Sequence, residues 1–232
     1  YQCFRKINNP NIYDREALKE LVPKIKPYCQ DTETGLLIVC KALYSVGVTV
    51  IVQNHLTLTG IRGGTFIIDG KPCIVLTDIF RRYTTIWETL IHELSHVLFD
   101  FALIKANVYH LTGDPDLYLI EEKAETFTRE FFCGYEDYKY IKPHIGNPFL
   151  VKRHSKELEI HPAFIYSSFR QFEQLLNGKN YYKAFTEFFP PISDTLKNMS
   201  SLTWADESLP EIANRIKADL ELTSNNNYEE QS

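Results

Sequence analysis

The sequence predicts an α+β fold: a small twisted β-sheet packed on two helices with candidate metal ligands, followed by a helical C-terminal extension. Short runs rich in β-branched residues at 48–53, 64–69 and 73–77 predict three strands. Apolar residues recur at helical spacing over most of the remaining chain. A chain of 232 residues is long enough to enclose a sizeable core.

Helices are expected both before and after the three strands in the sequence. Residues 11–29 have a helical pattern that Pro23 and Pro27 interrupt, and residues 33–47 form a second helix closed by Gly47. A mostly buried helix is expected from about Tyr83, because its apolar residues leave only a narrow polar face. The same spacing predicts later helices at residues 117–134, 147–159, 162–176, 180–189 and 208–222.

The three strands are expected to form an antiparallel sheet. Asp69 and Gly70 predict a hairpin turn between the last two strands. The strand at 73–77 directly precedes the buried helix, so we expect one of its edges to lie open beside any site on that helix. Backbone groups of residues 74–76 could then accept an extended peptide.

These patterns divide the chain into four segments. Residues 1–35 are a helical lead-in, 36–145 the domain with candidate chemistry, 146–222 a helical extension and 223–232 a polar tail expected to be disordered. Because the chain begins with Tyr1 rather than Met, we expect another segment to precede it.

Composition narrows the class of protein. The formal net charge is -5, so the sequence lacks the basic character of a nucleic-acid-binding surface, and direct nucleic-acid binding is not expected. The longest apolar runs are too short to cross a bilayer and no secretory signal is visible, which favours a cytoplasmic location. The five cysteines lack CxxC spacing and are expected to be reduced thiols. The oligomeric state stays open.

Residues 89–100, "TLIHELSHVLFD", contain the strongest chemical motif. On a helix, His92 and His96 lie one turn apart on the same face and can both bind one metal ion. Glu93 is rotated by about 100°, which suits a general base that is not itself a ligand. The alternative is a buried helix with two hydrogen-bonded histidines and a chance glutamate. Burying these polar groups is costly without a partner, so a metal site is favoured.

A third ligand is expected on the following helix. "EEKAETFTRE" offers Glu121, Glu122 and Glu125, and small Ala124 would allow the two helices to approach closely. The alternative is a solvated acidic helix face. Helix geometry alone does not decide among the three glutamates.

Residues 81–100 and 121–132 resemble the ImmA/IrrE family of zinc metallopeptidases, in which HExxH is followed by a helix that opens E-x-x-A-[ND]. The resemblance extends over residues 36–176 and is strongest at 83–132. It includes "IHPAFIYSSFRQFE", which is similar to a segment in members fused behind a Cro/repressor-type helix-turn-helix domain. Such a DNA-binding domain is therefore a candidate for the preceding segment.

The resemblance implies that His92, His96 and Glu121 bind zinc and that Glu93 is the general base. Glu125 stands where the family has Asn or Asp, a residue that supports a ligand histidine, and is a candidate for that role. His161 is a candidate oxyanion stabiliser or substrate contact, with a simple helix N-terminus as the alternative; Tyr83, Tyr109 and Tyr118 are rivals for the oxyanion role.

The resulting expectation is a zinc-dependent endopeptidase that cleaves a protein, namely a helix-turn-helix repressor in a stress or mobile-element response. One Zn²⁺ per chain is expected, and Mn²⁺ suits the same ligands. The alternative is a non-proteolytic, zinc-stabilised sensor or interaction domain of a transcriptional regulator or antitoxin. Retention of Glu93 favours the enzyme, because a structural metal site has no need of a base.

Overall fold

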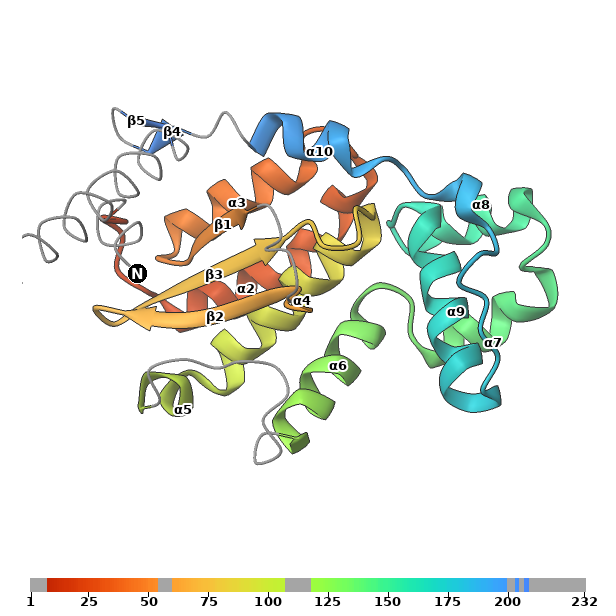
Figure 1. Cartoon of the computed structure of the whole chain (residues 1–232), viewed down its shortest axis with the longest axis horizontal. Coiled ribbons are helices and arrows are strands. Elements are labelled where there is room, and N and C mark those ends of the chain that lie inside the picture. The colour runs from red at the N-terminus through yellow and green to blue at the C-terminus, as the bar shows by residue number, and fades with distance from the viewer. Residues whose placement is uncertain (1–7, 54–59, 107–117, 200–202, 205–206, 209–232) are drawn as a thin grey trace, which may run out of the picture.

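A three-stranded mixed sheet and a larger set of helices make up the chain in the computed structural model, which confirms the predicted α+β class (Figure 1). The structure describes residues 8–53, 60–106, 118–199, 203–204 and 207–208. The helices are α2 (Arg15–Ile25), α3 (Gly35–Ser45), α4 (Tyr83–Phe99), α5 (Phe101–Ala106), α6 (Tyr118–Phe132), α7 (Tyr135–Ile141), α8 (Pro148–Glu157), α9 (Pro162–Asn177) and α10 (Ile192–Met199). The strands are β1 (Thr49–Gln53), β2 (Gly63–Ile68), β3 (Lys71–Thr77), β4 (Thr203–Trp204) and β5 (Glu207–Ser208).

The main sheet has the order β1-β3-β2, so the prediction of an all-antiparallel sheet is wrong. β2 and β3 are antiparallel, but β1 pairs with β3 in parallel, with Thr49 opposite Cys73. The open edge expected at residues 74–76 does not exist, because β3 is the central strand. A hairpin motif defines only its own two strands, and the side on which β1 joins them depends on packing elsewhere. The edge strand beside the later helices is β2.

The predicted hairpin turn is confirmed. Asp69 and Gly70 connect Ile68 to its pairing partner Lys71, and both turn residues have positive φ, 51° and 80°. Two successive residues with positive φ form a type I′ turn, whose twist matches that of the flanking strands. Asp-Gly is the preferred pair because both residues tolerate the left-handed region.

Helix α4 connects the layers of the fold. It packs against β2 and β3 on one side and against α6 on another, and it also contacts α2 and α9. Thirteen of its 17 residues are buried, as its almost uniformly apolar pattern predicts. Trp87 and Leu90 are fully buried within the core. The position of α4 therefore determines where its few polar side chains can lie.

The N-terminal helices end near Pro27 and Gly47, but the expected interruption at Pro23 is wrong. Helix α2 continues through Pro23 to Ile25 and becomes a 3₁₀ turn, Lys26–Gln30. After α3 the chain reverses at Gly47, whose φ is 83°. A Cβ there would lie 2.5 Å from the backbone of Tyr13, so glycine is required by both conformation and space.

The C-terminal part differs from its prediction at several points. Residues 180–189 are turns with a 3₁₀ segment, Thr186–Phe188, rather than a helix, and the helices α7 and α10 were not predicted. Asn180 accepts a hydrogen bond from the Tyr182 backbone N–H, and such local side-chain bonds compete with helix formation. Ser208, the expected start of a helix, lies in β5, whereas residues 209–222 and the tail at 223–232 lie outside the described residues.

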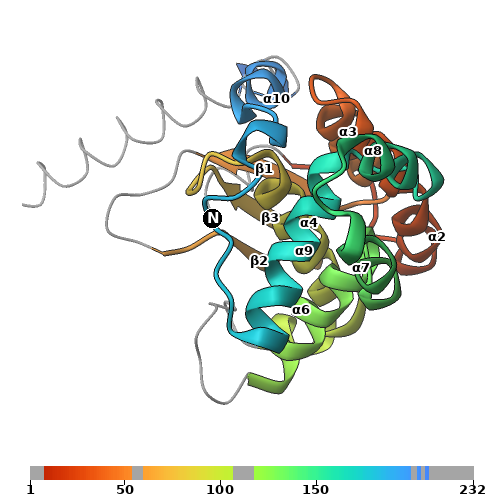
Figure 2. The ribbon, with the colours of Figure 1, turned by 90° about the vertical axis from the view of Figure 1, so that its right-hand side faces the viewer.

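Helices α7, α8 and α9 gather at one end of the fold, on the right in Figure 1 and facing the viewer in Figure 2. The chain then returns across the molecule, and α10 packs on α3, where Thr195 donates a 2.5 Å hydrogen bond to the carbonyl of Thr32. One buried cluster includes side chains from α2, α3, the sheet, α4, α8, α9 and α10. The proposed boundaries at 35/36 and 145/146 stay predictions.

The described helices include none with the length and apolar character needed to span a membrane. Four cysteines within the described residues are buried and free of disulfides: Cys29, Cys40, Cys73 and Cys133. Burial raises the pKa of each of these thiols to about 12, so they are uncharged at neutral pH.

Candidate metal centre

His92 and His96 project from one face of α4 toward the first turn of α6. Their Nε2 atoms are 3.2 Å apart, and their rings meet edge to face. His96 is fully buried, whereas His92 is partly exposed. The one-turn spacing inferred from the sequence therefore brings two imidazole nitrogens to one point.

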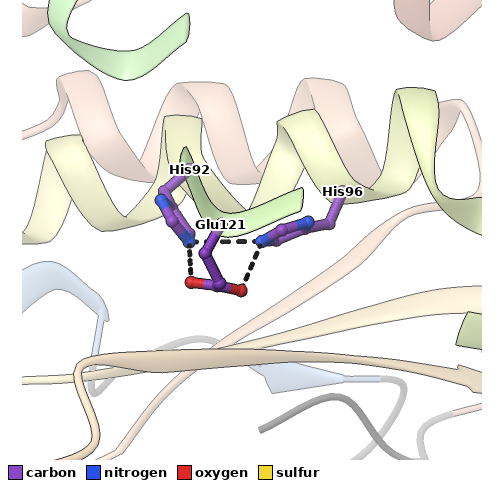
Figure 3. Close-up of side chains that lie close together, drawn as sticks. All are labelled: His92, His96 and Glu121. Carbon is purple, nitrogen blue, oxygen red and sulfur yellow. Dashed lines mark hydrogen bonds and ion pairs between the residues drawn. The ribbon is translucent and has the colours of Figure 1, made fainter. Parts of the chain in front are cut away.

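Glu121 completes the group from α6 (Figure 3). Its two carboxylate oxygens lie 3.4 Å from the Nε2 atoms of His92 and His96 respectively. Ala124, one turn later on α6, is only 2% exposed, so the small side chain lies in the closely packed interface between the helices. Of the three glutamates that the sequence left open, Glu121 is the one that meets both histidines.

The spacing of these donors fits a metal ion. Two donors about 2.0–2.1 Å from a tetrahedral zinc ion lie about 3.4 Å from each other. The three separations among His92, His96 and Glu121 are 3.2, 3.4 and 3.4 Å. We call these residues the metal triad; they form the one group of metal-ligand type found among the described residues.

Asp100 supports His96 from behind. The side chain lies at the C-terminal end of α4, and its Oδ2 is 2.9 Å from Nδ1 of His96. When Asp100 accepts the Nδ1 proton, Nε2 keeps its lone pair directed at the triad. Burial lowers the pKa of His96, but hydrogen bonds with Glu121 and Asp100 outweigh it, and the pKa is raised. The sequence signal for this partner is an acid four residues, or one helical turn, after His96.

Glu125 does not take the supporting role that was considered for it. Its side chain is 60% exposed and pairs with Arg129, which lies one turn later on the same helix, at 3.4 Å. The carboxylate therefore lies on the surface of α6 with Arg129 and not at the histidines. This interpretation of Glu125 is therefore corrected in favour of Asp100.

Glu93 lies beside the triad, 3% exposed. Thr65 on β2 donates a 2.6 Å hydrogen bond to its Oε2 and so restricts the carboxylate to one orientation. Burial raises the pKa of Glu93, against the opposing effects of His92 and Thr65. A Cβ on Gly63 would lie 2.5 Å from Thr89 and 2.9 Å from Glu93, so glycine is needed for β2 to approach α4 here.

His161 lies away from these groups. It is the N-cap of α9, where its Nδ1 accepts a 3.1 Å hydrogen bond from the Ala163 backbone N–H, and its ring packs edge-on against Tyr83. Tyr83 is fully buried and donates to the carbonyl of Cys29. His161 therefore matches the alternative considered for it, a residue at a helix N-terminus that takes no part in catalysis. Tyr109 lies outside the described residues.

His92, Glu121 and Glu93 open onto a cleft of about 1000 Å³, whereas His96 is fully buried behind them. Its walls are formed by the segment that enters β2, by the exposed faces of α4, α6 and α9, and by the turns at 180–189. His92, Glu93 and Glu121 line one part of it, and Arg82, ten residues before His92, lines another part together with Arg170 and aromatic rings. An elongated ligand could therefore reach the triad from solvent.

Searches of protein-family models, curated proteins and solved structures found no match to this chain.

Proposed function

We propose that this chain is a zinc-dependent endopeptidase. Its main support is the convergence of His92, His96 and Glu121 at separations suited to one tetrahedral ion, with Glu93 beside them in an open cleft. Two histidines and a glutamate are a donor set of catalytic zinc sites, which leave one position open. Manganese suits the same donors.

A bound zinc ion would supply a Lewis acid that polarises the peptide carbonyl and lowers the pKa of a water molecule. Glu93 takes the proton of the attacking water and later passes it to the leaving amine. Its raised pKa suits both steps, because a base that must also release the proton works best near the ambient pH. Thr65 orients the carboxylate, and Asp100 orients His96.

The proposed substrate is a flexible segment of a protein. An extended peptide can add to β2, the edge strand beside Glu93, through backbone hydrogen bonds. Resemblance to the ImmA/IrrE motifs suggests a helix-turn-helix repressor as the substrate. A long, open cleft suits a chain that passes through the site, as an endopeptidase requires.

The test is incubation of the zinc-loaded protein with a repressor encoded beside it. We expect one defined cut that a chelator prevents and that Glu93→Gln slows by about 10²–10⁴-fold while zinc stays bound. Glu122→Gln is the matched control, because Glu122 is the exposed neighbour of Glu121 and the chemical change is identical.

Two results would separate the alternatives. Loss of zinc without loss of cleavage would contradict the metal mechanism. A protein that binds zinc, cuts no repressor and instead alters DNA binding by that repressor would be the non-proteolytic sensor. In that case Glu93→Gln should leave the regulatory effect unchanged.

A further inference from the structure

The end of the cleft away from the metal triad contains arginines held against aromatic rings. The guanidinium carbon of Arg82 lies 3.9 Å from the ring centre of Tyr182, and that of Arg170 lies 4.2 Å from the ring centre of Phe189. Arg170 also donates to the carbonyl of Ala184. Stacking and this hydrogen bond restrict the two guanidinium groups before any ligand arrives.

These charges are not balanced within the described residues. Arg62, Arg82 and Arg170 all line the cleft. None of them forms a salt bridge with another described residue. Nε of Arg170 is buried without a hydrogen-bond partner. Burial and then the charge of Arg82 lower the pKa of Arg170, so the two like charges act on each other. A buried donor without a partner and repelling cations both favour an added anion.

Two acids act on Arg170, the exposed Glu187 and Glu88, and neither forms a salt bridge with an arginine of the cleft among the described residues. Glu88 accepts hydrogen bonds from Ser167, at 2.6 Å, and from Gln171, at 3.1 Å. Burial raises its pKa to about 7, although Ser167, Arg62 and Gln171 oppose the shift. The Glu88 carboxylate is therefore already hydrogen-bonded to two side chains of α9, and at neutral pH it is only partly ionised. We call Arg62, Arg82, Glu88 and Arg170 the arginine end of the cleft.

The distance from the triad is that of a few peptide residues. Glu88 lies four residues before His92 on α4, which is about 6 Å along the helix axis. Arg82, at the N-cap of α4, lies ten residues before His92, which is about 15 Å along the same axis. An extended peptide advances about 3.3 Å per residue. A chain positioned at the triad therefore reaches the arginine end after about two to five residues.

We infer that the arginine end binds a carboxylate of the peptide substrate, about two to five residues from the bond that is cut. This inference rests on the proposed peptidase function. The carboxylate is either an acidic side chain or the C-terminus of the peptide, and both offer the planar pair of oxygens that arginine binds through two N–H groups. Such a site would select substrates by charge at a distance from the zinc.

The test measures binding by fluorescence anisotropy to the zinc-loaded Glu93→Gln protein, in which hydrolysis is disabled. Three labelled octapeptides of otherwise identical, alanine-rich sequence are compared: one with an internal Glu and an amidated C-terminus, one with Gln and an amidated C-terminus, and one with Gln and a free C-terminus. We expect a carboxylate peptide to bind about tenfold tighter than the uncharged one. Whether the first or the third peptide gains identifies the source.

Arg170→Gln and, separately, Arg82→Gln should remove most of that preference. Arg129→Gln, a change at an arginine that lines the same cleft but is paired with Glu125, should retain it. If Arg129→Gln keeps the preference, the carboxylate binds at Arg82 and Arg170. If it loses the preference as well, the carboxylate is attracted by the general positive charge of the cleft or by zinc. If one arginine variant fails to fold, the other still decides.

Equal binding of all three peptides would overturn the inference, as would an unchanged preference in folded arginine variants. Failure of the peptidase proposal gives a different result: the parental protein would cleave nothing, yet the arginine-dependent preference would remain. Cleavage without a carboxylate preference would support the peptidase proposal and contradict the carboxylate site at the arginines.

Discussion

The metal end of the cleft takes two of its three candidate donors from one helix, whereas the arginine end gathers its charges from segments far apart in the chain. His92 and His96 are separated by one turn of α4, and Glu121 follows on the helix packed against it. Arg62 precedes β2, Arg82 begins α4 and Arg170 lies in α9. The metal end is specified by local spacing, while the arginine end depends on how distant elements meet.

The two ends also differ in electrostatics. The triad contains one acid and two histidines that can surround a cation, and Glu93 adds a second acid beside it. The arginine end places three cations near Glu88, whose pKa is raised to about 7, and near the exposed Glu187. One cleft therefore offers sites for a metal ion at one end and for an anion at the other. The following predictions test this difference.

The largest expected effect is loss of the metal. His92→Ala and His96→Ala each remove one of three donors, so a purified protein with about one zinc equivalent should fall close to zero. His144→Ala, a change at an exposed histidine, is the control and should keep the metal. Elemental analysis measures all three. Undiminished zinc in both triad variants would place the metal elsewhere.

Glu88 at the arginine end should produce a pH-dependent effect on stability. Its folded-state pKa is raised from 4.5 to about 7, so the folded protein binds the proton more tightly than the unfolded chain does. Stability of the parental protein is therefore lost as pH rises between these values. Glu88→Gln should remove this loss and gain about 2–3 kcal/mol relative to the parent between pH 4 and pH 8.

Urea unfolding at several pH values, at equal zinc content, measures this gain. Glu125→Gln serves as the control, because it makes the same chemical change at a mostly exposed side chain. If the unfolding free energies of Glu88→Gln and the parent changed with pH in the same way, the pKa of Glu88 would not be raised in the folded protein. The contrast between the ends would then rest on the arginines alone.

Asp100 should affect zinc affinity more weakly than the ligands do. Asp100→Ala removes the acceptor at Nδ1 of His96, and loss of such a partner typically weakens metal binding by about 10- to 100-fold. Competition with a chromophoric chelator measures the change. Glu125→Ala should leave affinity near the parental value; the reverse result would restore Glu125 to the supporting role inferred from the family motif.

The smallest effect is expected at His161. His161→Ala removes the N-cap acceptor of α9 and should cost about 1 kcal/mol of unfolding free energy, with zinc content and hydrolysis unchanged. Urea denaturation and elemental analysis together check this outcome. A loss of activity equal to that of Glu93→Gln, with fold and zinc intact, would instead move His161 into the chemistry.

Much of the metal end follows from the sequence alone. The spacing of His92, Glu93 and His96 on an apolar helix depends only on helical periodicity, and the Asp69-Gly70 turn and the bend at Gly47 depend only on local backbone preference. Each of these features is determined within a few residues. The choice of Glu121 over Glu122 and Glu125 rested on the resemblance to a family motif, because helix geometry left all three open.

Only the tertiary structure decided the parallel pairing of β1, the role of Asp100 rather than Glu125, and the assembly of the arginine end. β1 could join either side of the β2–β3 hairpin, and packing of α3 and α4 around the sheet determines which. Arg82 and Arg170 are 88 positions apart, and neither shows a local pattern that predicts the other. Contacts of this kind depend on the free energy of the whole core, which no short segment contains.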